Sequence, residues 1–135
     1  MPSTPKRTTV VRPEFEATFA TLKDLLRKQA PKALVVRDVP GDFQIASPTL
    51  VDRIGRPLTL AMAQIKKSYV SFHFMPVYMN PALLESLSPG LRKRMQGKSC
   101  FNFNTIEPAD ARELSALTKK GIAGFRNLKL PWAKV

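Results

Sequence analysis

The sequence predicts an α+β domain in which helices at the N- and C-terminal ends pack on one face of an antiparallel sheet. Two observations predict it: apolar residues recur at helical spacing near both ends of the chain, and apolar and polar residues alternate between them. Strands grouped between helices, rather than alternating with them, favour an antiparallel sheet with its helices on one face. The 135 residues are a usual length for one domain.

The first helix is predicted to begin at Pro13, because a proline in the first turn sacrifices no hydrogen bond, and to end before Pro31. Glu14 and Glu16 lie in its first turn, where the helix dipole favours negative charge. Its apolar stripe consists of Phe15, Phe19, Leu22 and Leu26.

Strands are predicted in the middle of the chain at residues 34–37, 42–47, 58–65 and 68–75. Turn residues at Gly55-Arg56-Pro57 and Lys66-Lys67 separate the last three. Along the last strand the side chains alternate between two faces, with Val70, Phe72 and Phe74 on one and Tyr69, Ser71 and His73 on the other. We expect the second set to be a polar face that could line a pocket.

After this strand, Pro76, Pro81 and Pro89 divide the chain into short helical turns, and residues 97–104 return to a strand pattern. A final helix is predicted to follow Pro108. We therefore expect a flexible N-terminal arm (1–12), one α+β domain (13–126) and a C-terminal tail (127–135). Three apolar residues of the tail are expected to dock back on the domain, namely Leu128, Leu130 and Trp132.

Charge is the unusual global feature of the chain. There are 22 Lys and Arg residues against 10 Asp and Glu residues, a formal net charge of +12. Such a field attracts anions and speeds encounters with them, and it says nothing about fold. Four of the cations are grouped around a glycine, and we name Arg92, Lys93, Arg94 and Lys98 the basic cluster. Arginine suits bidentate capture of phosphate or carboxylate. The basic cluster is the predicted contact for an anionic small molecule or an acidic partner, and its simpler interpretation is a solvated loop.

Several functional classes are disfavoured by motif and composition. The segment Gly97-Lys98-Ser99 is not a phosphate loop, because its spacing from Gly90 and its order before a strand are both wrong. The longest apolar stretch, residues 58–65, is far shorter than the roughly 20 residues of a spanning helix. No apolar signal segment follows the N-terminus, and Cys100 is the only cysteine, which suits a reducing compartment. We expect a cytoplasmic protein, and the sequence leaves its oligomeric state open.

Nucleic acid is the less favoured polyanion, because binding of single strands needs aromatic rings exposed beside cations. The eight phenylalanines all lie in core-like patterns and are expected to pack inward. Tyr69, Tyr78 and Trp132 are the aromatic residues left as candidates for stacking. No helix-turn-helix, zinc-finger or RNA-recognition signature is present.

Catalytic and metal-binding constellations are not evident, and we assign no catalytic residue, metal or cofactor. His73 is the single histidine, and its simpler interpretation is a partly buried polar residue. Cys100 reads as a small hydrophobe in its strand. If their strands are adjacent, the two could form a nucleophile pair, which makes an enzyme the third functional hypothesis.

Four segments of the chain carry a family resemblance: the stretch from Tyr69 to Pro76, the helical turn at Leu83-Leu84, the segment Gly97 to Phe103 and the helix after Pro108. Their layout resembles the YdhG-like family of small bacterial proteins. The resemblance covers most of residues 13–125 and implies an α+β fold with an antiparallel sheet. Most members have no assigned activity.

Some members of that family are described as frataxin-like iron chaperones, which makes iron handling the alternative function. Iron chaperones hold the metal on clustered carboxylates, whereas the first helix here offers Glu14, Glu16 and Asp24 interleaved with basic residues. We therefore assign no iron-binding residue.

Overall fold

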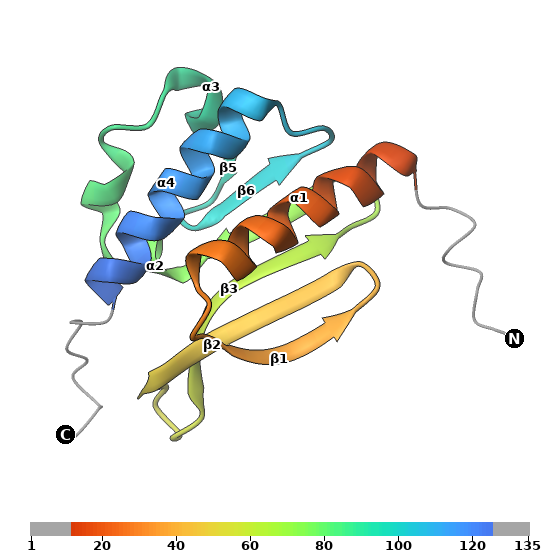
Figure 1. Cartoon of the computed structure of the whole chain (residues 1–135). Coiled ribbons are helices and arrows are strands. Elements are labelled where there is room, and N and C mark those ends of the chain that lie inside the picture. Colours follow the sequence, from red (N-terminus) through yellow and green to blue (C-terminus); the bar gives the residue numbers. More distant parts are fainter. Residues whose placement is uncertain (1–11, 126–135) are drawn as a thin grey trace, which may run out of the picture.

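Within residues 12–125, which the computed structural model describes, a six-stranded antiparallel sheet forms the framework of the protein (Figure 1). The strands are β1 (Leu34–Val39), β2 (Asp42–Val51), β3 (Pro57–Ile65), β4 (Val70–Phe74), β5 (Met95–Gln96) and β6 (Cys100–Phe103). They lie in the order β1-β2-β3-β4-β6-β5, so β1 and β5 form its two edges. The predicted antiparallel sheet is confirmed.

The two long helices lie side by side on one face of this sheet, as predicted (Figure 1). They are α1 (Pro13–Gln29) and α4 (Pro108–Phe125). Three short helical segments connect β4 to β5 and contact α4, namely α2 (Met75–Met79), the 3-10 helix η2 (Pro81–Leu84) and α3 (Pro89–Arg92). The α+β class is therefore confirmed.

Phenylalanine side chains fill the layer between the sheet and the helices. All eight are buried, so the prediction that they pack inward is confirmed. Across the sheet, Phe43, Ala63 and Phe72 lie at neighbouring register positions on adjacent strands. Helix α1 packs mainly over β3, where the fully buried Ala61 and Ala63 are small enough to let a helix approach closely.

The segment after β4 differs from the prediction. The last strand was expected to reach residue 75, but β4 ends at Phe74 and Met75 begins α2. Pro76 lies in the first turn of α2, where its missing N–H leaves no hydrogen bond unmade. Strand β5 was not predicted, because two residues are too few to show an alternating pattern.

Strand β2 extends further than predicted, through Pro48 to Val51. Its pairing with β3 is interrupted between Ala46 and Val51. Pro48 lies inside that interruption, where the lack of a backbone donor breaks no ladder hydrogen bond.

Two predictions lie outside the described residues. They are the N-terminal arm, apart from Arg12, and the docking of the tail through Leu128, Leu130 and Trp132. Among the residues that are described, no helix has the length and apolar character needed to cross a membrane.

Candidate functional site

The basic cluster lies at the β5 edge of the sheet. Arg92 ends α3, Lys93 and Arg94 connect α3 to β5, and Lys98 lies in the turn between β5 and β6. All four residues are exposed. Met95 pairs with Phe101 and Gln96 pairs with Cys100, which holds the chain that carries the cluster against β6. The cluster therefore runs from the end of α3 to the turn of the β5–β6 hairpin.

The turn of this hairpin depends on Gly97. Its φ is 72°, in the left-handed region that side chains disfavour. A Cβ atom built at Gly97 would meet no atom within 4 Å, so the requirement for glycine comes from the backbone and not from crowding. Lys98 follows at the tip of the turn.

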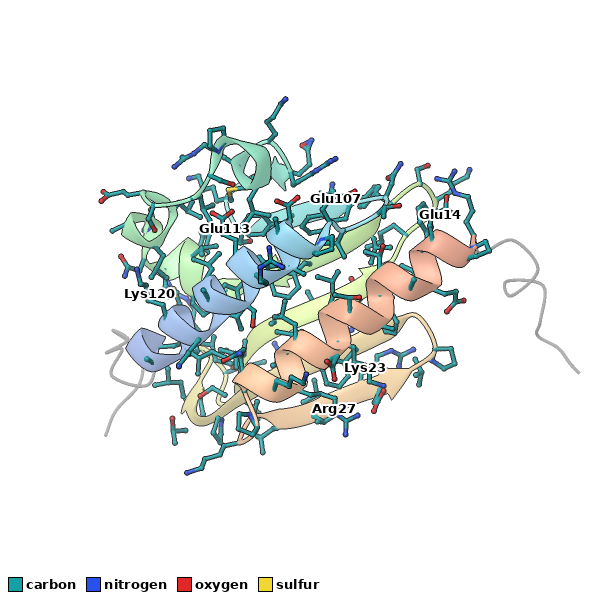
Figure 2. The ribbon with its side chains drawn as sticks, turned by 45° about the horizontal axis from the view of Figure 1, so that its top comes forward. Glu14, Lys23, Arg27, Glu107, Glu113 and Lys120 are labelled. Atoms are coloured by element: carbon teal, nitrogen blue, oxygen red, sulfur yellow. The ribbon has the colours of Figure 1, made fainter. Side chains whose placement is uncertain are left out.

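Helix α3, which leads into the cluster, is anchored at its start to α4. Ser88 is the N-cap of α3, and its hydroxyl oxygen accepts a hydrogen bond from the N–H of Leu91 at 3.2 Å. The carboxylate of Glu113, on the side of α4 that faces α3 (Figure 2), accepts hydrogen bonds from the N–H of Ser88 at 2.7 Å and from its hydroxyl at 2.6 Å. This anchor was missed from the sequence, where Glu113 looks like an ordinary acidic residue near a helix N-terminus.

Carboxylates do not neutralise the basic cluster in the described part of the chain. The ion pairs found among residues 12–125 join other residues, for example Lys23 with Asp38 and Arg37 with Asp42, both at 2.6 Å. Arg92 donates a short hydrogen bond to the carbonyl oxygen of Leu84, which occupies part of its guanidinium group. Within residues 12–125, the side chains of Lys93, Arg94 and Lys98 have no hydrogen-bond or ion-pair partner, and Lys93 and Arg94 make hydrogen bonds through their backbones alone.

The predicted polar face is the side of the sheet opposite α1 and α4. Ser71 and His73 lie on β4 and share this face, whereas Tyr69 precedes β4 and its carbonyl oxygen accepts a hydrogen bond from the N–H of Lys66 in the turn. Ser71 is buried, and Tyr69 and His73 are half-buried.

The antiparallel register of β4 and β6 brings His73 directly opposite Cys100. The Nδ1 atom of His73 lies 3.2 Å from the Sγ atom of Cys100 and 3.0 Å from the Oγ atom of Ser99. Burial lowers the pKa of His73 below its ordinary value, because it disfavours the charged imidazolium. The expectation that the strands of His73 and Cys100 could be adjacent is met. Ser99 also contacts His73, and this contact was not predicted from the sequence.

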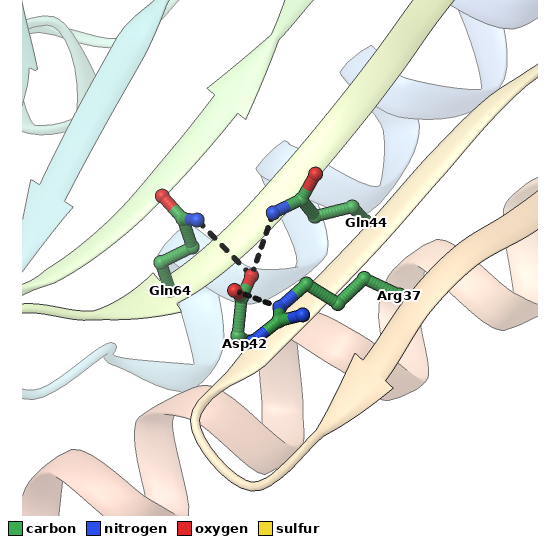
Figure 3. Close-up of polar contacts among 4 residues, drawn as sticks. All are labelled: Arg37, Asp42, Gln44 and Gln64. Carbon is green, nitrogen blue, oxygen red and sulfur yellow. Dashed lines mark hydrogen bonds and ion pairs between the residues drawn. The ribbon is translucent and has the colours of Figure 1, made fainter.

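A second polar cluster on the same face braces the first three strands (Figure 3). The carboxylate of Asp42 accepts hydrogen bonds from Arg37 at 2.6 Å and from Gln44 and Gln64 at 3.0 Å each. Burial alone would raise the pKa of Asp42, but these hydrogen bonds and the charge of Arg37 outweigh it and hold the pKa below its ordinary value. The carboxylate is thus occupied in linking β1, β2 and β3.

The main cavities lie away from the residues predicted from the sequence. An apolar cavity of about 290 Å³ between the ends of α1 and α4 is lined by residues that include Ala30, Leu60 and Phe125. A polar hollow of about 350 Å³ lies beside Asp42 at the turn between β1 and β2. Neither is lined by the basic cluster or by the polar face formed by Tyr69, Ser71 and His73. The role of that face as a pocket wall stays a prediction.

No group of three or more His, Cys, Asp or Glu side chains suited to a metal ion occurs within the part of the chain that the structure describes. Comparisons with known proteins add no assignment, since no family model, curated protein or solved structure matches the chain.

Proposed function

We propose that the protein is a noncatalytic module that binds an anionic partner through the basic cluster. One observation carries the proposal: Lys93, Arg94 and Lys98 are exposed together at the β5 edge, and no carboxylate among residues 12–125 pairs with them. Some other surface cations, for example Lys23 and Arg37, are each paired with an aspartate.

The geometry of the cluster favours an extended polyanion over a small ion. The cluster is exposed and the cavities described above lie elsewhere, so a small anion bound there would keep most of its hydration. Each exposed cation then contributes little, because solvent screens it. A chain of phosphates can meet several cations in succession and release counterions from each of them. The net charge of +12 would speed the encounter.

The test measures binding of fluorescently labelled inorganic polyphosphate at several salt concentrations, with orthophosphate as the small-anion comparison. The double variant Arg94→Gln/Lys98→Gln removes two cations of the cluster. Its control, Lys66→Gln/Lys67→Gln, removes the same charge from exposed residues of the turn between β3 and β4. We expect the cluster variant to lose roughly tenfold in affinity and the slope of log K against log salt to fall by about two. The control should lose far less.

Equal losses in the two double variants would mean that net charge alone attracts the probe, and they would remove the cluster from the proposal. If binding does not depend on salt concentration, or if polyphosphate does not bind at low salt, the proposed function is wrong. Tighter binding of orthophosphate than of polyphosphate, counted per molecule, would replace the extended ligand by a small one.

A second candidate function rests on the 3.2 Å separation of His73 Nδ1 and Cys100 Sγ. A neutral imidazole at hydrogen-bonding distance from a thiol can accept its proton, and the thiolate is the reactive nucleophile. Such an enzyme would use Cys100 as nucleophile and His73 as base.

The test of this second function is the rate at which iodoacetamide alkylates Cys100, with release of iodide, as a function of pH. If the pair is activated, alkylation at neutral pH will exceed that of a free cysteine and will slow at least fivefold in His73→Gln. Equal rates in His73→Gln and the unmodified protein would contradict it. Ser99→Ala separates the contribution of the neighbouring hydroxyl.

Membership of the YdhG-like family and the iron-chaperone alternative stay predictions. The described residues supply no ligand cluster on which an iron site can be argued. Anaerobic titration with ferrous iron tests that alternative, and binding in the micromolar range would revive it.

A further inference from the structure

Strand β1 is an open edge of the sheet. Among residues 12–125, it is the first strand in the sheet order and pairs only with β2. All six of its residues, Leu34–Val39, are exposed, so no helix among the described residues covers either of its faces. In Figure 1 it lies at the edge of the sheet opposite β5. An edge strand leaves backbone N–H and C=O groups available for pairing with another strand.

The apolar surface of the described residues is concentrated on this strand. Six large hydrophobic side chains are exposed within residues 12–125, and four of them belong to β1: Leu34, Val35, Val36 and Val39. Val35 and Val36 are 58% and 56% exposed. Single exposed apolar residues need no explanation, but a group of them on an unpaired strand marks an interaction surface.

Both charged side chains of β1 are paired with opposite charges, unlike the cations at the β5 edge. Arg37 pairs with Asp42, and Asp38 pairs with Lys23 of α1, each at 2.6 Å. Figure 2 shows Lys23 on the side of α1 toward β1. A molecule of net charge +12 can therefore approach a second copy along β1 without bringing unpaired cations of β1 together. The same approach along β5 would oppose Lys93, Arg94 and Lys98 to their own copies.

We propose that β1 is the self-association edge of this protein, and that two copies pair β1 with β1 in antiparallel order about a two-fold axis. A strand related to itself by a two-fold axis perpendicular to the sheet is necessarily antiparallel, and it presents the same apolar residues to the other copy. The pairing joins the two sheets into one and places α1 and α4 of both copies on the same face. Each copy keeps its basic cluster at a distant outer edge.

The affinity of this dimer is limited by two features. The register of β1 against β2 shifts between Val35 and Arg37, so a bulge at Val36 shortens the straight part of the strand. The net charges of the two copies also repel each other over longer distances. We therefore expect a dissociation constant in the micromolar range that decreases as salt screens the repulsion. Polyanion binding at the basic cluster has the opposite salt dependence, so the two proposals can fail separately.

The experiment is sedimentation velocity of the full chain over a wide concentration range, at low and high salt. The edge variant is Val36→Lys, which places a charge on the strand. Its control is Ile54→Lys, which makes a comparable change at a side chain that is 72% exposed in the turn between β2 and β3. Both variants add one positive charge, and both positions are exposed, so both should fold. Thermal melts confirm this for each.

We expect Val36→Lys to raise the dissociation constant at least tenfold and Ile54→Lys to change it less than threefold. Amide exchange in residues 34–39 should slow as the protein concentration rises, because the edge N–H groups become hydrogen-bonded. The proposal is overturned if the protein is a monomer at every concentration. In that case β1 faces solvent, a different partner or another segment of this chain. A dimer that tolerates Val36→Lys, or that leaves exchange in β1 unchanged, also overturns it.

Discussion

Glu113 on α4 and Ser88 at the start of α3 are joined by two hydrogen bonds to one carboxylate. The backbone N–H of Ser88 donates at 2.7 Å and its hydroxyl donates at 2.6 Å. The hydroxyl can then accept from the N–H of Leu91, so the carboxylate orients the residue that caps α3. The contact spans 25 positions of sequence and holds the segment that leads into the basic cluster.

Replacement of Glu113 by Ala should destabilise the protein by about 1–3 kcal/mol, because hydrogen bonds to a charged group are stronger than average and the N–H of Ser88 loses its acceptor. Urea denaturation at pH 7 measures the change. Glu107→Ala is the control, since Glu107 is exposed near the same helix start and its side chain has no partner within residues 12–125. A loss in Glu107→Ala as large as that in Glu113→Ala would show that general helix electrostatics, and not the Ser88 contact, is responsible.

Two glycines of α4 should respond in opposite directions to replacement by Ala. A Cβ at Gly121 would lie 2.6 Å from Cε2 of Phe74 and 3.1 Å from Cβ of Pro76, so the core must shift. We expect Gly121→Ala to cost about 1–3 kcal/mol through overpacking. A Cβ at Gly124 meets no atom within 4 Å, and Gly124→Ala should be neutral or stabilising by up to about 1 kcal/mol through helix propensity. Thermal unfolding of both variants checks this, and a stable Gly121→Ala would contradict the close packing of α4.

The hydrogen bonds that the Asp42 carboxylate accepts, which we call the Asp42 brace, should make the stability of the protein depend on pH. Its pKa is lowered in the fold, so the unfolded chain takes up a proton first as pH falls, and the stabilisation is lost below the ordinary aspartate pKa of about 3.9. Asp42→Asn should cost about 1–2 kcal/mol at pH 7, and the difference from the unmodified protein should shrink at pH values below about 4. Urea denaturation across this range measures it.

Asp24→Asn is the matched control for the brace. The Asp24 side chain is 64% exposed and pairs with Lys28 on the surface of α1, where solvent screens the interaction. Its effect should be small at every pH. A pH-independent difference for Asp42→Asn would mean that the brace acts through packing instead of charge.

His73 offers a direct measurement, because it is the only histidine and its ring signals need no assignment. Burial lowers its pKa, so an NMR titration should give a value below the ordinary one of about 6.5. The unfolded chain binds the proton more readily, and stability should therefore fall as pH drops below about 6.5. This part of the pH dependence should disappear in His73→Gln. A pKa above 6.5 would instead indicate an imidazolium held by the Cys100 thiolate.

Local patterns were sufficient to predict much of the fold. Pro13 and the apolar stripe through Leu26 identified α1, and alternation around Phe72 identified β4 and its inward face. Short elements escaped prediction for physical reasons. Pro76 breaks a strand pattern and also starts a helix well, so the boundary at Met75 was missed. The two residues of β5 exist because β6 pairs with them, not because of their own preference.

Only part of the candidate site could be predicted from the sequence. The basic cluster could be identified because its four cations are neighbours in sequence, and it stays exposed in the fold. Its lack of carboxylate partners within residues 12–125 could not be foreseen, since ion pairs such as Arg37 with Asp42 depend on which strands meet. The same limit applies to Ser99, whose place beside His73 follows from the register of β4 and β6.

By itself, the sequence determined where the two long helices and most strands form and which phenylalanine rings are buried, because periodicity and apolar character act over a few neighbouring residues. Tertiary structure alone decided that β1 became an apolar, charge-balanced edge, that Glu113 holds Ser88, and that His73 faces Cys100. These relationships join residues far apart in the chain. They arise from strand order and register, and these depend on how the whole core packs.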